Sequence, residues 1–325
     1  MARNFTSKLW NASRFALINL QNYTPAAVAD SELTTEDRWV LSRLATVTRD
    51  VTASLAHYHY ADAAKTLYDF AWDEFCSFYI EMAKPRLQAE ATRPHAQRVL
   101  AHVLDGLLRL LHPMMPFVTE EVWQLLNQMA PERGIGTPGA NASGSLSAEW
   151  LIVAPWPEAD TARIDATIET RFRIFQQVLA SLREVRNRQN ISLKQPIEFA
   201  IRCDDATAAL LTPMLAYFDS MVNAKSLGMG PAASPPATHS KSALGSMEVF
   251  VDLKDFIDKP AEIAKNEKLE QQLVPFIKGK EAKLSNESFV ARAPASVVET
   301  ERTALAQAQE QLRSVRETLA SLRSG

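Results

Sequence analysis

The sequence predicts a mainly α-helical protein made of an antiparallel helical bundle, a small α/β connector subdomain and a C-terminal antiparallel coiled-coil hairpin. Three observations lead to this fold class. Long amphipathic stretches with short connections fill the chain up to about residue 130, a pattern typical of an antiparallel bundle. Strand-like apolar runs occur only in the middle of the chain, at residues 197–203 and 247–253. A heptad spacing of apolar residues begins after residue 260, as in a coiled coil.

The bundle is expected over residues 1–160. Its first helix is predicted over residues 4–22 and ends before Pro25, because proline cannot continue a helix. Residues 34–37, with the sequence Thr-Thr-Glu-Asp, form an N-cap cluster for the next helix. Three further helices follow, over residues 60–85, 93–111 and 116–129.

The connector is expected over residues 161–257. Before it, residues 131–149 are rich in Pro, Gly, Ser and Asn without apolar periodicity, which indicates a flexible loop, and residues 151–153 are predicted to be extended. Within the connector the sequence predicts, in order, a helix, a strand, a helix, a Pro- and Ser-rich loop and a strand, over residues 165–188, 197–203, 205–218, 228–246 and 247–253.

The coiled-coil hairpin is expected over residues 258–325. Its second arm spaces apolar residues at intervals of three and four, interrupted only by Glu301: Val298, Leu305, Ala308, Leu312, Val315, Leu319 and Leu322. The first arm offers a matching seam of Ile263, Leu269, Leu273 and Phe276. Pro275 and Gly279 lie inside that arm and predict a kink or fraying.

Composition limits the classes of function. The chain has 325 residues, of which 46% are hydrophobic and 22% charged, as in soluble globular proteins. A formal net charge of -3 gives no global attraction to nucleic acid, so any such contact must be local. Cys76 and Cys203 are far apart, which excludes a zinc ribbon and argues against disulfides. Without a signal peptide or an apolar span, we expect a cytoplasmic protein.

The first helix carries a pattern suited to unpaired RNA bases. Lys8, Asn11 and Phe15 are spaced i, i+3 and i+7 and therefore share one stripe, with Arg14 beside them. A lysine can meet a phosphate, an amide can bond a base edge, and a ring can stack on a base. The alternative is that Phe15 is a core residue and Lys8 a solvated rim charge.

Two other basic groups are candidate contacts to a nucleic-acid backbone. The first is the densest basic patch of the connector, and the alternative for it is a solvated helix face. The second lies near the predicted tip of the hairpin, where lysines can also serve solubility alone. The two groups are Arg183, Arg186, Arg188 and Lys194, and Lys278, Lys280, Lys283 and Arg292.

Two apparent sites are rejected. Asp73 and Glu74 could suggest acid–base catalysis, but adjacent helical positions diverge by about 100° and cannot face one substrate, so both are expected at the rim of the bundle. His57 and His59 could suggest a metal site, but helical residues two apart point away from each other and no third ligand is evident. No catalytic and no metal-binding residues are predicted.

Several segments carry a resemblance to a known family. They are residues 8–15, 71–75 (Ala-Trp-Asp-Glu-Phe), 112–123 (His-Pro-Met-Met-Pro-Phe-Val-Thr-Glu-Glu-Val-Trp) and 154–157 (Ala-Pro-Trp-Pro), with Arg186-Asn187 followed by Lys194–Ile197. Together they resemble the anticodon-binding region of class I aminoacyl-tRNA synthetases of the valine, isoleucine and leucine group. Residues 283–290, 293–294 and 297–302 look like the tRNA-binding coiled coil of the valyl-tRNA synthetase family. An isoleucine enzyme would be expected to end in a cysteine-rich zinc module, and no cysteine follows Cys203.

The resemblance implies a function in translation. The chain is similar to the C-terminal portion of a bacterial-type valine enzyme, which attaches valine to its tRNA with ATP. Neither a His-x-Gly-His nor a Lys-Met-Ser-Lys-Ser stretch occurs, so this chain should be inactive alone. We expect no cofactor in it, with ATP and Mg bound only by the absent catalytic domain.

The expected partner is tRNA, specific for valine, bound by a monomer. The anticodon is expected at the stripe of the first helix and the tRNA elbow at the hairpin tip. The alternatives are the equivalent part of an isoleucyl- or leucyl-tRNA synthetase, and a coiled-coil scaffold that binds protein partners.

Overall fold

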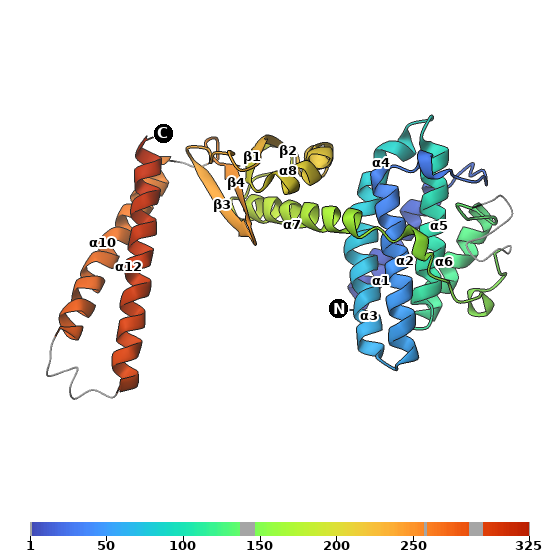
Figure 1. The fold of residues 1–325 in the computed structure, drawn as a ribbon, viewed down its shortest axis with the longest axis horizontal. Coiled ribbons are helices and arrows are strands. Elements are labelled where there is room, and N and C mark those ends of the chain that lie inside the picture. The colour runs from blue at the N-terminus through green and yellow to red at the C-terminus, as the bar shows by residue number, and fades with distance from the viewer. Residues whose placement is uncertain (1, 137–146, 257–258, 286–294, 325) are drawn as a thin grey trace. The chain divides into compact units, whose positions relative to one another are not determined.

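The computed structural model describes residues 2–136, 147–256, 259–285 and 295–324. Contacts between Cα atoms divide the chain into two compact units, residues 1–174 and 175–325. Helices predominate in both, and a small sheet lies in the second, so the predicted mainly α fold class is confirmed (Figure 1). No helix in the described ranges is both long and apolar enough to cross a membrane.

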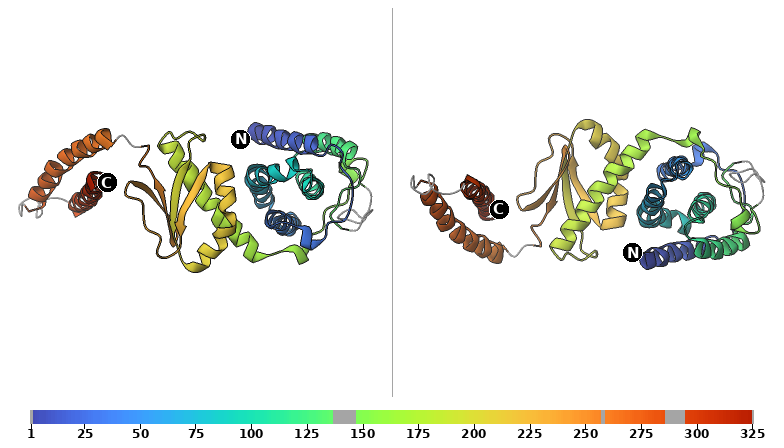
Figure 2. Two further views of the ribbon diagram at one scale, coloured as in Figure 1. Left: turned by 90° about the horizontal axis from the view of Figure 1, so that it is seen from above. Right: turned by 90° about the horizontal axis from the view of Figure 1, so that it is seen from below.

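Unit 1 is a bundle whose helices run side by side (Figures 1 and 2). The predicted bounds of the fourth and fifth helices are confirmed to the residue, and a bond from the Thr34 backbone N–H to the Asp37 carboxylate (3.3 Å) caps α2 as expected. The helices are α1 (Ala2–Asn19), α2 (Thr35–Ala56), α3 (Tyr60–Asp69), α4 (Ile80–Gln88), α5 (Arg93–Leu111) and α6 (Pro116–Met129).

The helix predicted over residues 60–85 is not α-helical throughout. Between α3 and α4 the chain continues as a π-helix, η2 (Phe70–Tyr79), so residues 60–88 form one uninterrupted helical rod. π-Helices are rare and often occur at functional sites. Helix periodicity in the sequence locates the rod but does not reveal the change in its winding.

The core of unit 1 is organised around α5, which is buried along almost its whole length. Gly106 allows this, because a Cβ atom there would lie 3.1 Å from the side chain of Leu44 on α2. Trp39 of α2 and Phe172, at the start of α7 (Ala166–Arg188), stack with ring centres 4.4 Å apart. Aliphatic and aromatic burial of this kind is the main stabilising contribution to such a bundle.

The structure corrects one prediction near the end of the bundle. Residues 151–153 form a 3-10 turn, η3 (Leu151–Val153), and are not extended. The backbone N–H of Leu151 donates to the Glu120 carboxylate instead of to a neighbouring strand (3.1 and 3.2 Å). A second 3-10 turn, η4 (Thr161–Arg163), precedes α7. Residues 137–146 of the predicted loop lie outside the described residues.

Unit 2 contains a four-stranded sheet in the order β2-β1-β4-β3, in which β1 is parallel to β2 and antiparallel to β4, and β4 is antiparallel to β3. The two predicted strands are its central ones. The sequence analysis missed both edge strands, since their mixed, half-exposed residues form no apolar run. The strands are β1 (Ile197–Arg202), β2 (Ala224–Met229), β3 (His239–Leu244) and β4 (Met247–Asp252).

Helices cover this sheet. The part of α7 in unit 2 lies along one face (Figure 2), and Phe175 packs on Phe218, which in turn meets Phe199 of β1. The helix predicted over residues 205–218 is two helices, α8 (Asp205–Leu211) and α9 (Leu215–Val222), joined by a 3-10 turn. Pro213 lies in that turn and has no N–H for an α-helical bond.

The C-terminal part forms the predicted antiparallel helix pair of α10 (Lys259–Leu284) and α12 (Ala295–Ser324) (Figure 1). The fraying expected at Pro275 and Gly279 does not occur, because α10 is helical through both residues. The expectation for Phe276 is wrong: this residue is 47% exposed, and Ile277 takes its place in the seam. The buried seam consists of Leu273, Ile277, Ala308, Val315 and Leu319. Two further residues predicted for the seam, Val298 and Leu322, have side chains that the structure does not describe.

Candidate nucleic-acid interface

The outer face of α1 gathers the residues predicted to read RNA. Asn11 and Arg14 are exposed, and Lys8 and Phe15 are half-buried along the edge that meets η2 and α4. Phe15 is therefore not a core residue. The ammonium of Lys84 on α4 lies over the Phe15 ring, 5.7 Å from its centre.

Lys8 is held in place on both sides. Its Nζ donates to the hydroxyl of Ser77 (2.6 Å) and lies 4.1 Å from the centre of the Trp72 ring, a cation–π contact. The Trp72 ring stacks on Tyr68 (5.6 Å between centres), and Tyr68 stacks on the buried Phe5 (5.0 Å). The sequence analysis missed Trp72 and Ser77, because they become neighbours only through the π-helix.

Asn11 lines a hollow of about 320 Å³ between α1 and α6, together with Thr6, Ser7, Trp10 and Val118. An amide, two hydroxyls and an indole offer both hydrogen-bonding groups and flat surface, which suits a nucleobase edge.

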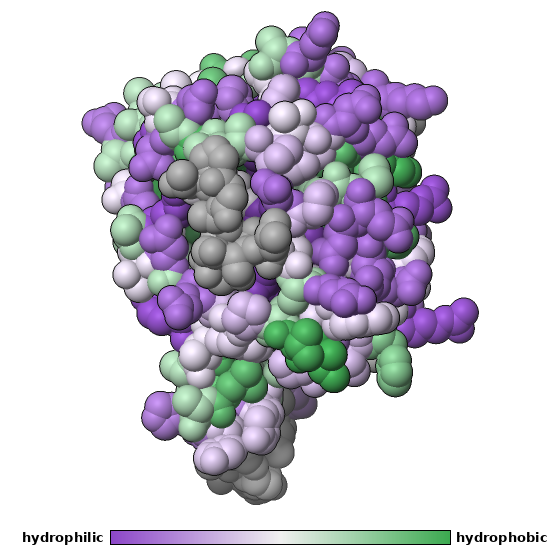
Figure 3. Space-filling model, turned by 90° about the vertical axis from the view of Figure 1, so that its right-hand side faces the viewer, coloured by the Kyte–Doolittle hydropathy of each residue, from purple (hydrophilic) through white to green (hydrophobic). Residues whose placement is uncertain are grey.

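On the face of unit 1 shown in Figure 3, hydrophilic residues predominate and hydrophobic ones form only small groups.

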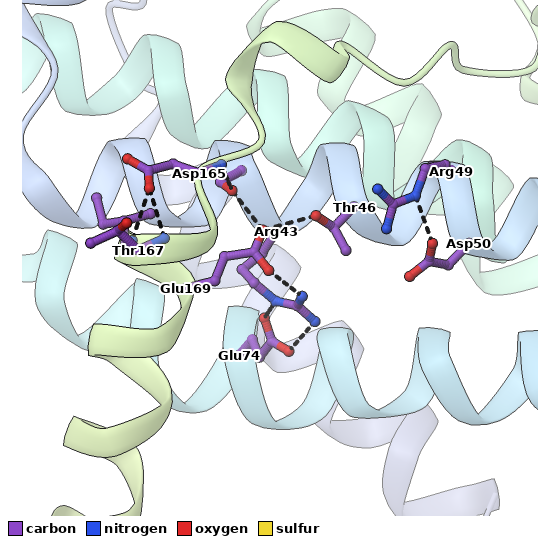
Figure 4. Close-up of polar contacts among 10 residues, drawn as sticks. Arg43, Thr46, Arg49, Asp50, Glu74, Asp165, Thr167 and Glu169 are labelled. Atoms are coloured by element: carbon purple, nitrogen blue, oxygen red, sulfur yellow. Dashed lines mark hydrogen bonds and ion pairs between the residues drawn. The ribbon is translucent and has the colours of Figure 1, made fainter.

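Glu74 is not at the rim, which corrects the prediction for it. Its carboxylate receives two bonds from Arg43 of α2 (2.7 and 2.9 Å), and Arg43 also binds Glu169 of α7 (3.0 Å) (Figure 4). Burial above all raises the pKa of Glu74, against the lowering effect of Arg43. Asp73, in contrast, is exposed as expected.

Glu169 completes this network, because its carboxylate also accepts bonds from Ser42 (2.6 Å) and Thr46 (2.8 Å). The Asp165 carboxylate caps the first turn of α7 through the backbone N–H groups of residues 167 and 168 (Figure 4). Glu169 thus fastens the start of α7 to α2, and Glu74 links η2 to Arg43, which Glu169 also binds.

Arg186 is the clearest correction among the predicted phosphate contacts. Only 2% of it is exposed, and its guanidinium donates to the backbone carbonyls of Val222, Ser192, Gln195 and Asn223 at 2.8–2.9 Å. Such a side chain ties the end of α9 to the turn before β1 and cannot reach a phosphate.

The other three members of the connector patch differ from Arg186. Lys194 is exposed in the turn that Arg186 holds. Arg188 is exposed and bonded to Glu184 (2.6 Å), and Arg183 is half-buried. Two exposed cations therefore remain at this patch.

The lysines near the hairpin tip have unequal surroundings. Lys280 and Lys283 both bind the Glu301 carboxylate (2.5 and 2.7 Å), which lowers the pKa of Glu301 and explains the charged interruption of the seam. Lys278 is exposed, as is much of Phe276, whose ring centre lies 5.2 Å from the Lys280 ammonium. Arg292 lies outside the described residues.

The rejected histidine pair lies at the exposed turn between α2 and α3, where Tyr58 has a left-handed backbone (φ 61°). Among the residues that the structure describes, no three His, Cys, Asp or Glu side chains group closely enough to hold a metal ion.

Comparisons with known proteins agree with this layout. The anticodon-binding domain of tRNA ligases matches residues 37–201, and the tRNA-binding arm of valyl-tRNA synthetase matches residues 258–323. The valine–tRNA ligase of Rhodopirellula baltica is 48% identical over 325 residues, which cover 99% of this chain and 31% of that protein. The valine–tRNA ligases of Syntrophotalea carbinolica (36% identical, 98% of this chain, 34% of that protein) and Thermotoga maritima (35%, 99% and 33%) are similar over the same extent.

The chain thus spans about a third of the length of the curated relatives that it matches. The first matched segment includes most of α2, the rest of the bundle after it and the start of unit 2, and the second includes most of α10 and α12. The helix α1 precedes the first segment. The chain belongs to the tRNA ligase family defined by this anticodon-binding domain, and it corresponds to the anticodon-binding and tRNA-binding-arm region of valine–tRNA ligases.

Proposed function

We propose that this chain is the tRNA-binding part of a valine–tRNA ligase, with the anticodon on the outer face of α1 and the tRNA elbow at the tip of the α10–α12 arm. The observation that carries the proposal is the face of α1, where Lys8, Asn11, Arg14 and Phe15 lie together. This helix packs against η2 and α6, which belong to the segment that matches the anticodon-binding family. Cation, amide and ring are the groups with which proteins read unpaired bases.

The role of the chain in this proposal is to bind and orient. Contacts at the anticodon and at the elbow would together direct the acceptor end of the tRNA to a catalytic domain. The chain itself has neither nucleotide-binding motif of the family, so activation of valine with ATP and Mg belongs elsewhere in the complete enzyme.

For the backbone contacts, the proposal assigns Arg183, Arg188 and Lys194 to the anticodon stem and Lys278 to the elbow. The arm buries its apolar seam between its own two helices, which supports a monomer over a coiled-coil scaffold. Cytoplasmic translation is the proposed setting.

Binding to transcripts of valine tRNA and isoleucine tRNA tests the proposal, measured by fluorescence anisotropy at low and moderate salt. We expect tighter binding of valine tRNA, with an affinity that falls as salt rises because phosphate contacts release counterions. Equal affinity for the two tRNAs, or no binding, would contradict the proposal for this chain.

A further inference from the structure

We propose that Trp72 and Ser77 are positioning residues that hold the Lys8 ammonium in a fixed place for RNA. This inference rests on the proposed function, because the RNA is the anticodon arm bound at α1. It adds a role for the π-helix η2, whose winding would bring Trp72 and Ser77 together around the Lys8 ammonium.

The π-helix is what makes Trp72 and Ser77 a pair. In an α-helix, residues five apart are separated by about 140° around the axis and face different sides. In a π-helix the hydrogen bonds join residues i and i+5, which brings these positions to one face. Ser77 Oγ donates to the backbone oxygen of Trp72, five residues earlier (2.8 Å), and so marks that change of winding.

Both groups that hold Lys8 are neutral. A hydroxyl and an aromatic ring can orient an ammonium without cancelling its charge, whereas a carboxylate would cancel most of its attraction for phosphate. Nearby lysines show the difference: Lys65 binds Asp69 and Lys84 binds Glu81 at 2.5 and 2.6 Å. Within the described ranges, no carboxylate forms an ion pair with Lys8, and the exposed Asp73 feels its charge only as a lowering effect on the pKa of its carboxyl, which burial raises.

The Trp72 ring is itself held in orientation. It stacks on Tyr68 at an interplanar angle of 10°, and Tyr68 stacks on Phe5, which lies on α1 one turn before Lys8. The same helix thus supplies both the cation and one end of the ring stack. A lysine loses much side-chain freedom on binding, and a lysine that is already held loses less, which favours affinity.

The experiment measures the affinity for valine tRNA, and its dependence on salt, for Lys8→Ala, Trp72→Leu, Trp72→Phe, Ser77→Ala and the Lys8→Ala/Trp72→Leu double variant. We expect Lys8→Ala to weaken binding and to reduce the salt slope by about 0.7, the value for one phosphate contact on a single strand. Trp72→Leu should weaken binding by about threefold to tenfold, with no further loss when it is added to Lys8→Ala. Trp72→Phe keeps a ring and should restore most of the affinity.

Ser77→Ala gives a second, gentler variant should Trp72→Leu fail to fold, with an expected loss of about twofold to tenfold. Lys65→Ala is the matched control, since this exposed lysine of α3 already binds Asp69 and should leave affinity and slope unchanged. Thermal melting of each variant separates folding from binding, because a structural tie alone would lower the melting temperature without changing the salt slope.

Two results would overturn different statements. If Lys8→Ala weakens binding while folded Trp72→Leu and Ser77→Ala bind like the wild type, Trp72 and Ser77 are not positioning residues for Lys8, and the proposed function stands. If Lys8→Ala and Phe15→Ala both fold and bind valine tRNA unchanged, the anticodon surface itself is wrong.

Discussion

At the residue scale, Phe15 decides whether the stripe on α1 is a reading surface. Its ring is half-buried beside Lys84, which leaves part of it open to a base. Stacking of one base on an aromatic ring contributes about 1–3 kcal/mol. Phe15→Ala should therefore weaken tRNA binding about tenfold or more, measured by anisotropy, with little change in melting temperature. Phe15→Tyr keeps the ring and serves as the control, and a loss of stability without a selective loss of binding would refute the assignment.

For Arg186 we predict the opposite of Phe15: a loss of stability and no direct loss of a contact with RNA. Removal of its guanidinium breaks four hydrogen bonds and takes the Arg186 donor from the carbonyl oxygens of Val222 and Gln195, at a cost of about 1–3 kcal/mol for each unsatisfied group. The carbonyls of Ser192 and Asn223 keep a backbone N–H donor. Arg186→Ala should lower the free energy of unfolding in urea by about 3 kcal/mol or more, whereas Arg188→Ala, at an exposed ion pair, should change it by less than about 1 kcal/mol. A stable Arg186→Ala protein with weakened tRNA binding would reinstate the phosphate role.

At the element scale, the arm should be sensitive to acid through Glu301. The bonds from Lys280 and Lys283 lower the pKa of this carboxylate in the folded arm. The stabilisation is therefore present above the ordinary glutamate pKa of 4.5 and is lost as pH falls through the lower folded value. The melting temperature of the arm, followed by circular dichroism, should fall between pH 6 and the acid range, about pH 3.

Glu301→Gln should remove part of that pH dependence and lower the melting temperature at neutral pH. Glu310→Gln is the matched control, because Glu310 lies on the same helix and forms an ion pair with the exposed Arg313. An unchanged acid response in Glu301→Gln would show that the Lys280–Glu301–Lys283 bridge does not stabilise the hairpin.

Elements differ in how far the sequence predicts them. The helices α5 and α6 follow from periodicity and from local signals such as Pro116 at the first helical position. The strands β2 and β3 carry no such signal, because edge strands pair on one side only and need not be apolar. The path of α10 through Pro275 is set by packing along α12, since the seam residues on either side of the proline are buried.

At the scale of the whole molecule, two separate contacts to one tRNA predict an affinity greater than either alone. An anticodon stem–loop should bind more weakly than the full valine tRNA. Lys278→Glu, at an exposed position of the arm, should weaken binding of the full tRNA and leave stem–loop binding unchanged, while Phe15→Ala should weaken both. Equal losses with Lys278→Glu for the two RNAs would exclude a contact of the arm with the elbow.

The sequence by itself determined what depends on neighbours along the chain: the helices, the coiled-coil seam, the central strands and the stripe of Lys8, Asn11 and Phe15. Only the tertiary structure decided which of the candidate cations are already bonded to other groups of the protein. It buried Arg186 under carbonyl oxygens, paired Lys280 and Lys283 with Glu301, and left Lys8 beside a ring and a hydroxyl. The physical reason is that a cation's partner is set by distance in space, and the partners here lie 6 to 69 residues away along the chain.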